Sequence, residues 1–203
     1  MFDSGISVKE LVDELISEVD IALDIPNATY VSWLNSLQQL LYTEVIKEQK
    51  KTTVQATENQ INISSIEVGS DENKPRFEDI YTIYADRRQL IKSTVASGVI
   101  FRDTFYKNNG NIGYNTKKAP TEITIIYIVR PAIIQVTSHG NITEGVNVML
   151  PIEFIDLAKA KLRGEAYKLA NEDALAAKWL NDYNTLLETF KVWIAEKSPN
   201  FGL

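Results

Sequence analysis

The chain has 203 residues and a formal net charge of −6, with 44% apolar and 24% charged residues. These values suit one globular domain, or one domain with an insertion, and they exclude disorder of the whole chain. The sequence contains no cysteine, which excludes disulfides, a thiol nucleophile and a cysteine-ligated zinc. The acidic balance argues against a dedicated nucleic-acid binder.

No apolar run reaches membrane-spanning length, and the start Met1-Phe2-Asp3 lacks the basic and apolar regions of a signal peptide. We therefore expect a soluble, intracellular product without membrane contact.

The first predicted helix spans about Ser7 to Asp20. Ser7 and Glu10 have the spacing of a capping box, in which each side chain accepts from the other residue's free N–H. The expected buried stripe is Val8, Leu11, Val12, Leu15, Ile16 and Val19. The opposite face carries an acidic row at four-residue steps: Glu10, Glu14 and Glu18. A solvated face is the simpler interpretation of this row, and a surface that avoids DNA is the functional one.

A second helix is predicted from Asn27, a candidate cap, to about Glu48. Its apolar row is Tyr30, Leu34, Leu37, Leu41 and Val45. Three lysines close it, Lys47, Lys50 and Lys51, where positive charge suits the helix dipole. A phosphate site is the alternative interpretation of these lysines.

The residues from 52 to 148 favour β-structure. Strands are predicted at 52–56, 60–63, 80–84, 89–92, 111–115 and 121–129. The segment 94–106 is ambiguous and could contain a short helix. The segment 132–149 is expected to be a long irregular connection.

The last quarter of the chain predicts two antiparallel helices, the first entered through Pro151. Asn171 offers a cap for the second helix. That helix carries a seam of Ala177, Leu180, Tyr183, Leu187, Phe190 and Ile194, and a second row of Trp179, Leu186 and Trp193. One face serves the hairpin, so we expect the second row to contact a further partner.

The predicted fold class is α+β, mainly α: a four-helix body of two helical hairpins with an inserted small antiparallel β region. Residues 1–50 and 150–196 would form the helical domain, 52–148 the insertion, and 197–203 a C-terminal arm.

No motif for catalysis, metal binding or cofactor binding is present, so no cofactor is expected. The single histidine, His139, stands in a turn-like segment and makes a poor metal site. The basic pairs Arg87-Arg88 and Lys117-Lys118 could contact a DNA backbone or an acidic partner, although solvated turns are the simpler interpretation. An enzyme with buried carboxylates would need a concave acidic pocket.

Four segments carry a further pattern: the run 33–38 in the second predicted helix, the strand that ends before Arg130-Pro131, and the segments 150–154 and 177–183. Together they resemble the head-to-tail adaptor proteins of tailed bacteriophages, also called head-completion or connector proteins. The run Trp33-Leu34-Asn35-Ser36-Leu37-Gln38 looks like that family's W-L-N-x-x-Q opening. The strand ending in Arg130-Pro131 is similar to its terminal strand. The segments 150–154 and 177–183 resemble the entry and the last helix of its C-terminal hairpin.

This resemblance implies a structural virion protein without enzymatic activity. It would form a ring, commonly of twelve copies, below the portal, join the DNA-filled head to the tail, and let DNA pass without specific binding. Its location would be the neck of the virion, with the host cytoplasm as the site of assembly. The implied partners are the portal, neighbouring copies and the next neck or tail protein. The alternatives are another neck or tail ring, such as a tail-completion or gatekeeper protein, and a cellular helical interaction domain.

The resemblance also suggests roles for individual residues. The candidates for portal or partner contact are Trp193, Pro199, Asn200, Phe201 and Leu203. Those for contact between subunits are Trp179, Leu186 and Trp193, and those for an acidic face toward the channel are Glu10, Glu14 and Glu18.

Overall fold

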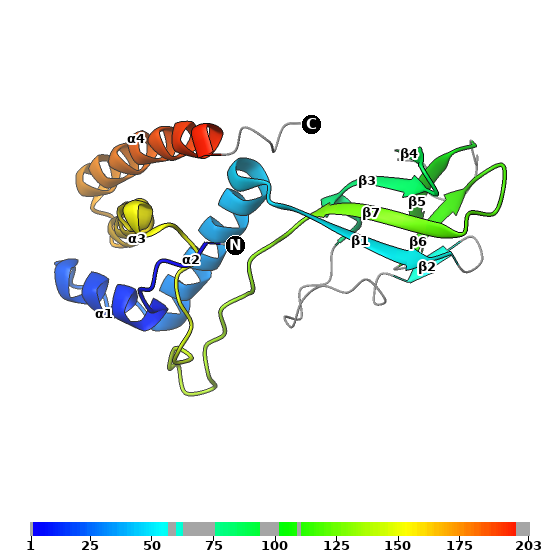
Figure 1. Ribbon diagram of the computed structural model, residues 1–203. Helices are drawn as coiled ribbons and strands as arrows, with labels where there is room; N and C mark the ends of the chain where they lie inside the picture. Colours follow the sequence, from blue (N-terminus) through cyan, green and yellow to red (C-terminus); the bar gives the residue numbers. More distant parts are fainter. Residues whose placement is uncertain (1, 57–59, 63–75, 94–101, 109–110, 198–203) are drawn as a thin grey trace. The chain divides into compact units, whose positions relative to one another are not determined.

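The computed structural model describes residues 2–56, 60–62, 76–93, 102–108 and 111–197 (Figure 1). The chain divides into two compact units, Met1–Ile46 with Ile133–Leu203, and Lys47–Ala132. We call the first the helical unit and the second the strand-rich unit. The segment 133–148, which the sequence analysis assigned to the insertion, belongs to the helical unit.

The described part of the helical unit contains four α-helices with a π-helical turn and a short 3-10 turn. In chain order these are α1 (Val8–Glu18), α2 (Asn27–Leu40), η1 (Leu41–Ile46), η4 (Ile152–Phe154), α3 (Ile155–Leu169) and α4 (Asp173–Lys197). Among the described residues, no helix combines the length and the apolar character that a membrane span requires.

The two N-terminal helices begin and end differently. The expected capping box of α1 is confirmed, with Ser7 and Glu10 bonded in both directions. The start of α2 has no side-chain cap, because Pro26 occupies the capping position, so the expected role of Asn27 is wrong.

The end of the second helix also differs from the expectation. Lys47 lies in the left-handed region with φ 50°, directly after the π-helical turn. Lys50 and Lys51 lie on the strand that follows, and their predicted place at the helix end is therefore wrong.

Helices α3 and α4 pack against each other in opposite directions. Phe154, before α3, contacts Phe190 near the end of α4, with ring centroids 4.8 Å apart. Gly164 permits the close approach, since a Cβ there would lie 2.8 Å from Cγ and Cδ2 of Leu180. Asn171 ends α3 in the left-handed region with φ 61°. Its N–H donates to Lys168 O and that of Glu172 to Tyr167 O, the pattern of a Schellman motif rather than the predicted cap of α4.

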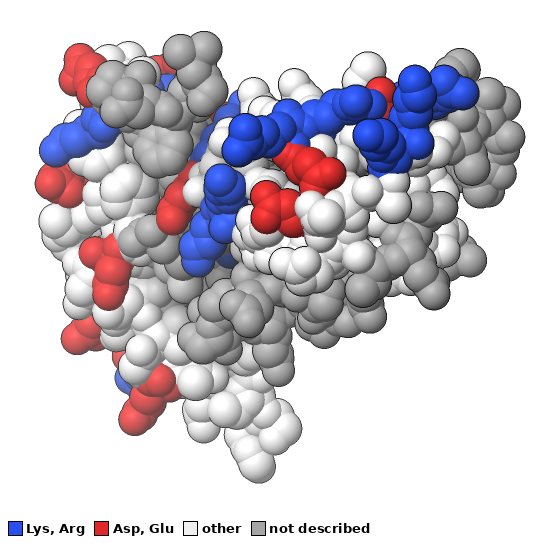
Figure 2. Space-filling model, turned by 45° about the vertical axis from the view of Figure 1, so that its right-hand side comes forward, with Lys and Arg blue, Asp and Glu red and all other residues white. Residues whose placement is uncertain are grey.

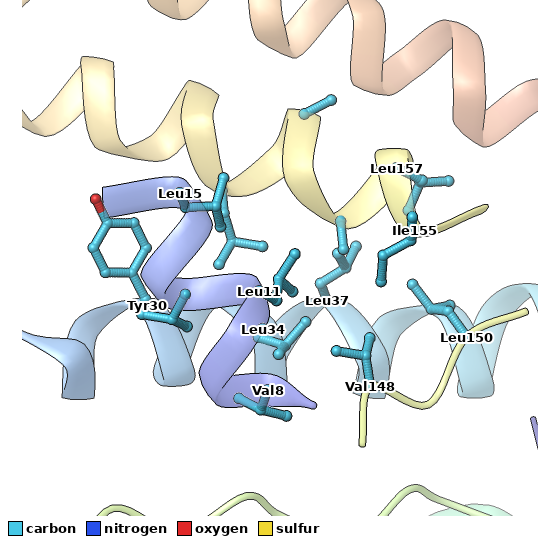
Figure 3. Close-up of a cluster of buried hydrophobic side chains, with 14 of the residues drawn as sticks. Val8, Leu11, Leu15, Tyr30, Leu34, Leu37, Val148, Leu150, Ile155 and Leu157 are labelled. Carbon is cyan, nitrogen blue, oxygen red and sulfur yellow. The ribbon is translucent and has the colours of Figure 1, made fainter. Parts of the chain in front are cut away.

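The chain that returns from the strand-rich unit completes the core of the helical unit. Val148 and Leu150 are fully buried and lie near Leu34 and Leu37 of α2 (Figure 3). Two amide side chains of α2 hold this segment. Asn35 donates to Ile134 O at 3.0 Å and accepts from Ile134 N–H at 2.9 Å. Gln38 Oε1 accepts from the N–H of Met149 at 2.7 Å.

The described strands of the strand-rich unit form a seven-stranded mixed sheet that curls into a half-barrel. Its strands are β1 (Gln49–Gln55), β2 (Gln60–Asn62), β3 (Ile80–Ala85), β4 (Arg88–Lys92), β5 (Thr104–Asn108), β6 (Asn111–Asn115) and β7 (Glu122–Ile128), with a 3-10 turn, η3 (Phe77–Asp79), before β3. The order across the sheet is β1-β7-β3-β4-β5-β6-β2, and β4 and β5 run parallel (Figure 1). Strands β3 and β4 are neighbours in the sheet and pair antiparallel.

The fold class predicted from the sequence is wrong. The strands do not form a small antiparallel insertion in a four-helix body, because they make a sheet with a hydrophobic core of its own. Ile123, Ile125 and Tyr127 of β7 are buried in that core. The strand alternation was visible locally, but the parallel pairing of β4 with β5 joins segments whose contact no local pattern reports.

Arg130 and Asp79 form an ion pair within the strand-rich unit. Arg130 donates to both carboxylate oxygens of Asp79, at 2.7 and 2.6 Å. Asp79 is only 5% exposed, so loss of Arg130 would leave a buried carboxylate without its ion-pair partner. The same hydrogen bonds are the first cause of a raised pKa at Arg130.

We expect Asn35→Ala to lower the free energy of unfolding of the helical unit by about 2 kcal/mol, because both backbone groups of Ile134 lose their partner. All three tryptophans (Trp33, Trp179 and Trp193) belong to this unit, so tryptophan fluorescence during urea unfolding reports on it. Ser36→Ala, one position along and exposed, is the matched control and should change little. Equal effects of the two substitutions would contradict the role given to Asn35.

Arg130→Leu should destabilise the strand-rich unit by about 3 kcal/mol, because it leaves Asp79 buried without its ionic partner. Hydrogen exchange of the amides of β3 and β7 measures this. Lys107→Leu removes an ion pair with Glu78 whose side chains are 60% and 59% exposed, and should cost less than about 1 kcal/mol. A larger loss in the control than in Arg130→Leu would refute the argument from burial.

Candidate functional site

Helix α4 leaves several apolar side chains partly uncovered on the side that α3 does not cover, among the described residues. Of the 25 residues of α4, only Ala176, Tyr183, Phe190 and Ile194 are buried, and α3 lies along this helix. Val192 is 58% exposed and Leu175 is 40% exposed. Between the buried and the exposed faces lie half-buried side chains: Trp179, Leu186, Leu187 and Trp193. The row predicted at seven-residue steps therefore forms one border of this face.

Trp193 belongs to an aromatic cluster near the end of α4. Its ring centroid lies 5.3 Å from that of Phe154, 5.8 Å from that of Phe2 and 6.2 Å from that of Phe190. The ammonium of Lys197 lies 5.2 Å from the same ring. Trp193 therefore joins the start of the chain to both C-terminal helices, and it leaves only part of its ring for a partner.

Trp179 and Leu186 line a hollow of about 500 Å³ between α3 and α4. The guanidinium of Arg163 lies 4.6 Å from the centre of the Trp179 ring, as in a cation–π contact. Asp156 and Asp182 also line the hollow. The hollow combines an aromatic ring, an aliphatic side chain and charges of both signs, the mixture that protein interfaces use at their centres and rims.

The acidic row of α1 is largely engaged in contacts within the unit. Glu14 pairs with Lys159 and Glu18 with Arg163, both on α3. Glu10 accepts from Ser7, and its pKa is lowered, first by the hydrogen bond from the Ser7 backbone and second by that from the Ser7 hydroxyl. The row thus fixes α1 to α3 and caps α1, and it presents less free charge than the sequence suggested.

The sequence analysis missed Lys159 and Arg163. These residues connect the acidic row to the hollow at Trp179, since Arg163 contacts both Glu18 and the tryptophan ring. A signal was present: the two cations stand four residues apart, as do Glu14 and Glu18. Opposite charges at matching helical spacing indicate two helix faces that can pair.

The remaining candidates are His139 and four residues near the C-terminus. His139 is exposed, and its Nδ1 lies 3.4 Å from the hydroxyl of Ser138. The part of the chain that the structure describes contains no group of three or more His, Cys, Asp or Glu placed to hold a metal ion. Pro199, Asn200, Phe201 and Leu203 lie outside the described residues.

No protein-family model matches the chain, and no curated protein matches it in sequence. The surfaces described above are therefore the basis for assigning a role.

The capping contact of Glu10 should make the stability of the helical unit depend on pH. The pKa of this carboxyl is lower in the folded chain, so its contribution is present above the unfolded pKa and is lost as the pH falls through the folded one. Glu10→Ala should therefore lower the urea midpoint at pH 7, and the difference from the parent should shrink in acid. Glu10→Gln keeps an acceptor for the Ser7 N–H and should show a smaller loss at pH 7. A difference for Glu10→Ala that does not vary with pH would contradict this assignment.

Proposed function

We propose that the chain is a structural adaptor of a tailed bacteriophage, which forms a ring below the portal, joins the DNA-filled head to the tail and continues the DNA channel. The observation that carries the proposal is the partly uncovered face of α4, bordered by Trp179, Leu186 and Trp193. The resemblance of the segments around Trp33, Arg130 and Pro151 to this family gives the face a specific role.

A ring of identical copies places one surface of each copy against a different surface of the next. The border of α4 suits such a contact, because tryptophan and arginine are enriched among residues that carry binding energy, and Trp179 and Arg163 meet at the hollow. Lys159 pairs with Glu14 and Arg163 pairs with Glu18, both on α1. These ion pairs restrict the two cations before a partner binds. Such preorganisation reduces the entropy lost on association.

In this proposal the protein acts in the neck of the virion and assembles in the host cytoplasm. Its partners are the portal, neighbouring copies and the next neck or tail protein. DNA passes through the ring as a mobile polymer and requires no recognition of base sequence.

The proposal predicts that Leu186→Lys prevents ring formation while the chain stays folded. Leu186 is only half-buried, so a lysine there can place its charge in solvent in the free chain, but the charge would be desolvated in a subunit contact. Mass photometry of the chain mixed with a portal protein of the same phage, followed by negative-stain imaging, measures ring formation. We expect closed rings on the portal for the parent chain and unassembled chains for the variant.

Ile16→Lys is the matched control, because Ile16 is 46% exposed on α1 and lies away from the α4 face. It should leave ring formation unchanged. A parent chain that stays monomeric in the presence of the portal would refute the proposal. Rings that form elsewhere in the neck of imaged particles would instead identify a tail-completion or gatekeeper protein.

A further inference from the structure

The net charge of −6 is the sum of an excess of cations in one unit and a larger excess of anions in the other. The strand-rich unit, residues 47–132, contains 13 lysines and arginines against 10 aspartates and glutamates. The helical unit contains 8 against 17. The local excess of cations therefore belongs to the strands, and the acidity of the chain belongs to the helices.

Many cations of the strand-rich unit have no acidic partner among the described residues. Three ion pairs use Arg88, Lys107 and Arg130. No ion pair with a described residue is made by the exposed cations Lys47, Lys50, Lys51, Arg87, Arg102, Lys117 and Lys118. Figure 2, which turns this part of the molecule toward the reader, shows lysine and arginine side chains in a row along its upper border.

One hollow of about 510 Å³ gathers several of these cations. It lies where the turn between β3 and β4 meets the loop before β7, and Arg87, Arg88 and Lys118 line it together with Asp86 and Thr116. Arg88 shares its charge with Asp103, at 3.0 Å, and its side chain is still 58% exposed. Five N–H donors on each guanidinium leave several for a ligand in the hollow.

Asp86 fixes the shape of this hollow. It lies in the left-handed region with φ 50°, and its N–H donates to Glu122 O. Its Oδ1 accepts from the N–H and the hydroxyl of Thr121, at 2.8 and 2.7 Å, and from the N–H of Glu122, at 3.1 Å. These hydrogen bonds join the β3–β4 turn to the start of β7. The backbone that carries the cations is therefore already ordered without a ligand.

The chemistry of the hollow fits a phosphate group. A guanidinium presents a planar fork of donors that matches phosphate oxygens, and Lys118 adds a point charge. The apolar residues that line the hollow, Ala85 and Pro120, are buried, so it offers no apolar anchor of the kind that a protein partner uses.

We propose that this hollow binds phosphates of the backbone of duplex DNA, independently of base sequence. The contact goes beyond the proposed function, in which DNA passes without specific binding, and it assigns the strand-rich unit as the part of the chain that contacts the polymer. It is a weak contact in a single chain, and copies in a ring would multiply it.

The test is fluorescence anisotropy of a labelled duplex of 30 base pairs (roughly three helical turns) with the full chain between about 50 and 200 mM salt. We expect binding that weakens with salt. The double variant Arg87→Gln and Lys118→Gln should bind the duplex about tenfold less tightly at the lowest salt. The slope of log K against log salt should become shallower by about 2, because each phosphate contact contributes about 0.9 and the variant loses two contacts. Arg87→Lys, which keeps the charge and loses the fork, should fall between the parent and the double variant.

The control is the double variant Lys50→Gln and Lys51→Gln, which removes the same charge from β1 of the same unit. It should weaken binding less than the hollow variant. An equal loss in both would mean diffuse charge and would overturn the assignment, as would a parent chain that does not bind the duplex at the lowest salt. A hollow variant that binds DNA normally but no longer assembles with copies or portal would identify an acidic protein surface as the ligand and would also overturn it.

These outcomes are separate from those of the ring assay. Portal assembly can fail while the duplex still binds, and duplex binding can fail while rings still form.

Discussion

The helical unit depends on the contact between α2 and the chain that returns from the strands. That segment is extended, and its backbone groups need partners once Val148 and Leu150 are buried. Asn35 and Gln38 supply donors and acceptors from a helix face that is otherwise apolar. The arrangement has a cost, because Gln38 Nε2 is buried without a hydrogen-bond partner among the described residues. The cost is tolerated because the same side chain places Met149, and thereby the entry to α3.

This contact gives physical content to the run Trp33-Leu34-Asn35-Ser36-Leu37-Gln38. Leu34 and Leu37 face the core, and the side chains of Asn35 and Gln38 hydrogen-bond the return segment. The run therefore contains both the apolar and the polar contacts that α2 makes with this segment. The resemblance of this run to a phage family is therefore a resemblance of packing. The proposed role therefore rests on the partly uncovered face of α4 as well as on this resemblance.

Sequence patterns predicted the elements that are determined locally. Helix periodicity located α1, α3 and α4, and alternation located β3, β4, β6 and β7. The sheet as a whole could not be predicted, because β1 pairs with β7 across some seventy residues, and the order of seven strands follows from such distant contacts. Asn171 shows a local failure: the same residue type suits the start of one helix and the left-handed end of another. At the candidate site, the aromatic row was predictable from its spacing, whereas the cation over Trp179 required the placement of α3 against α4.

The net charge of the whole chain does not predict the electrostatic potential at one local site. An acidic total suggested a surface that DNA would avoid, yet fixed charges act over about 10 Å at 0.1 M salt, which is less than the width of a domain. A phosphate near Arg87 responds to Arg88, Lys118 and Asp86, and the aspartates and glutamates of the helices are screened from it wherever they lie beyond that distance. Asp86 lowers the local charge, but its carboxylate is held by three donors, and the same three donors lower its pKa, so it remains an anion that shapes the loop. The sign of the potential at the hollow is thus set by which side chains the β3–β4 turn and the loop before β7 bring together, and the composition of the whole chain has little influence on it.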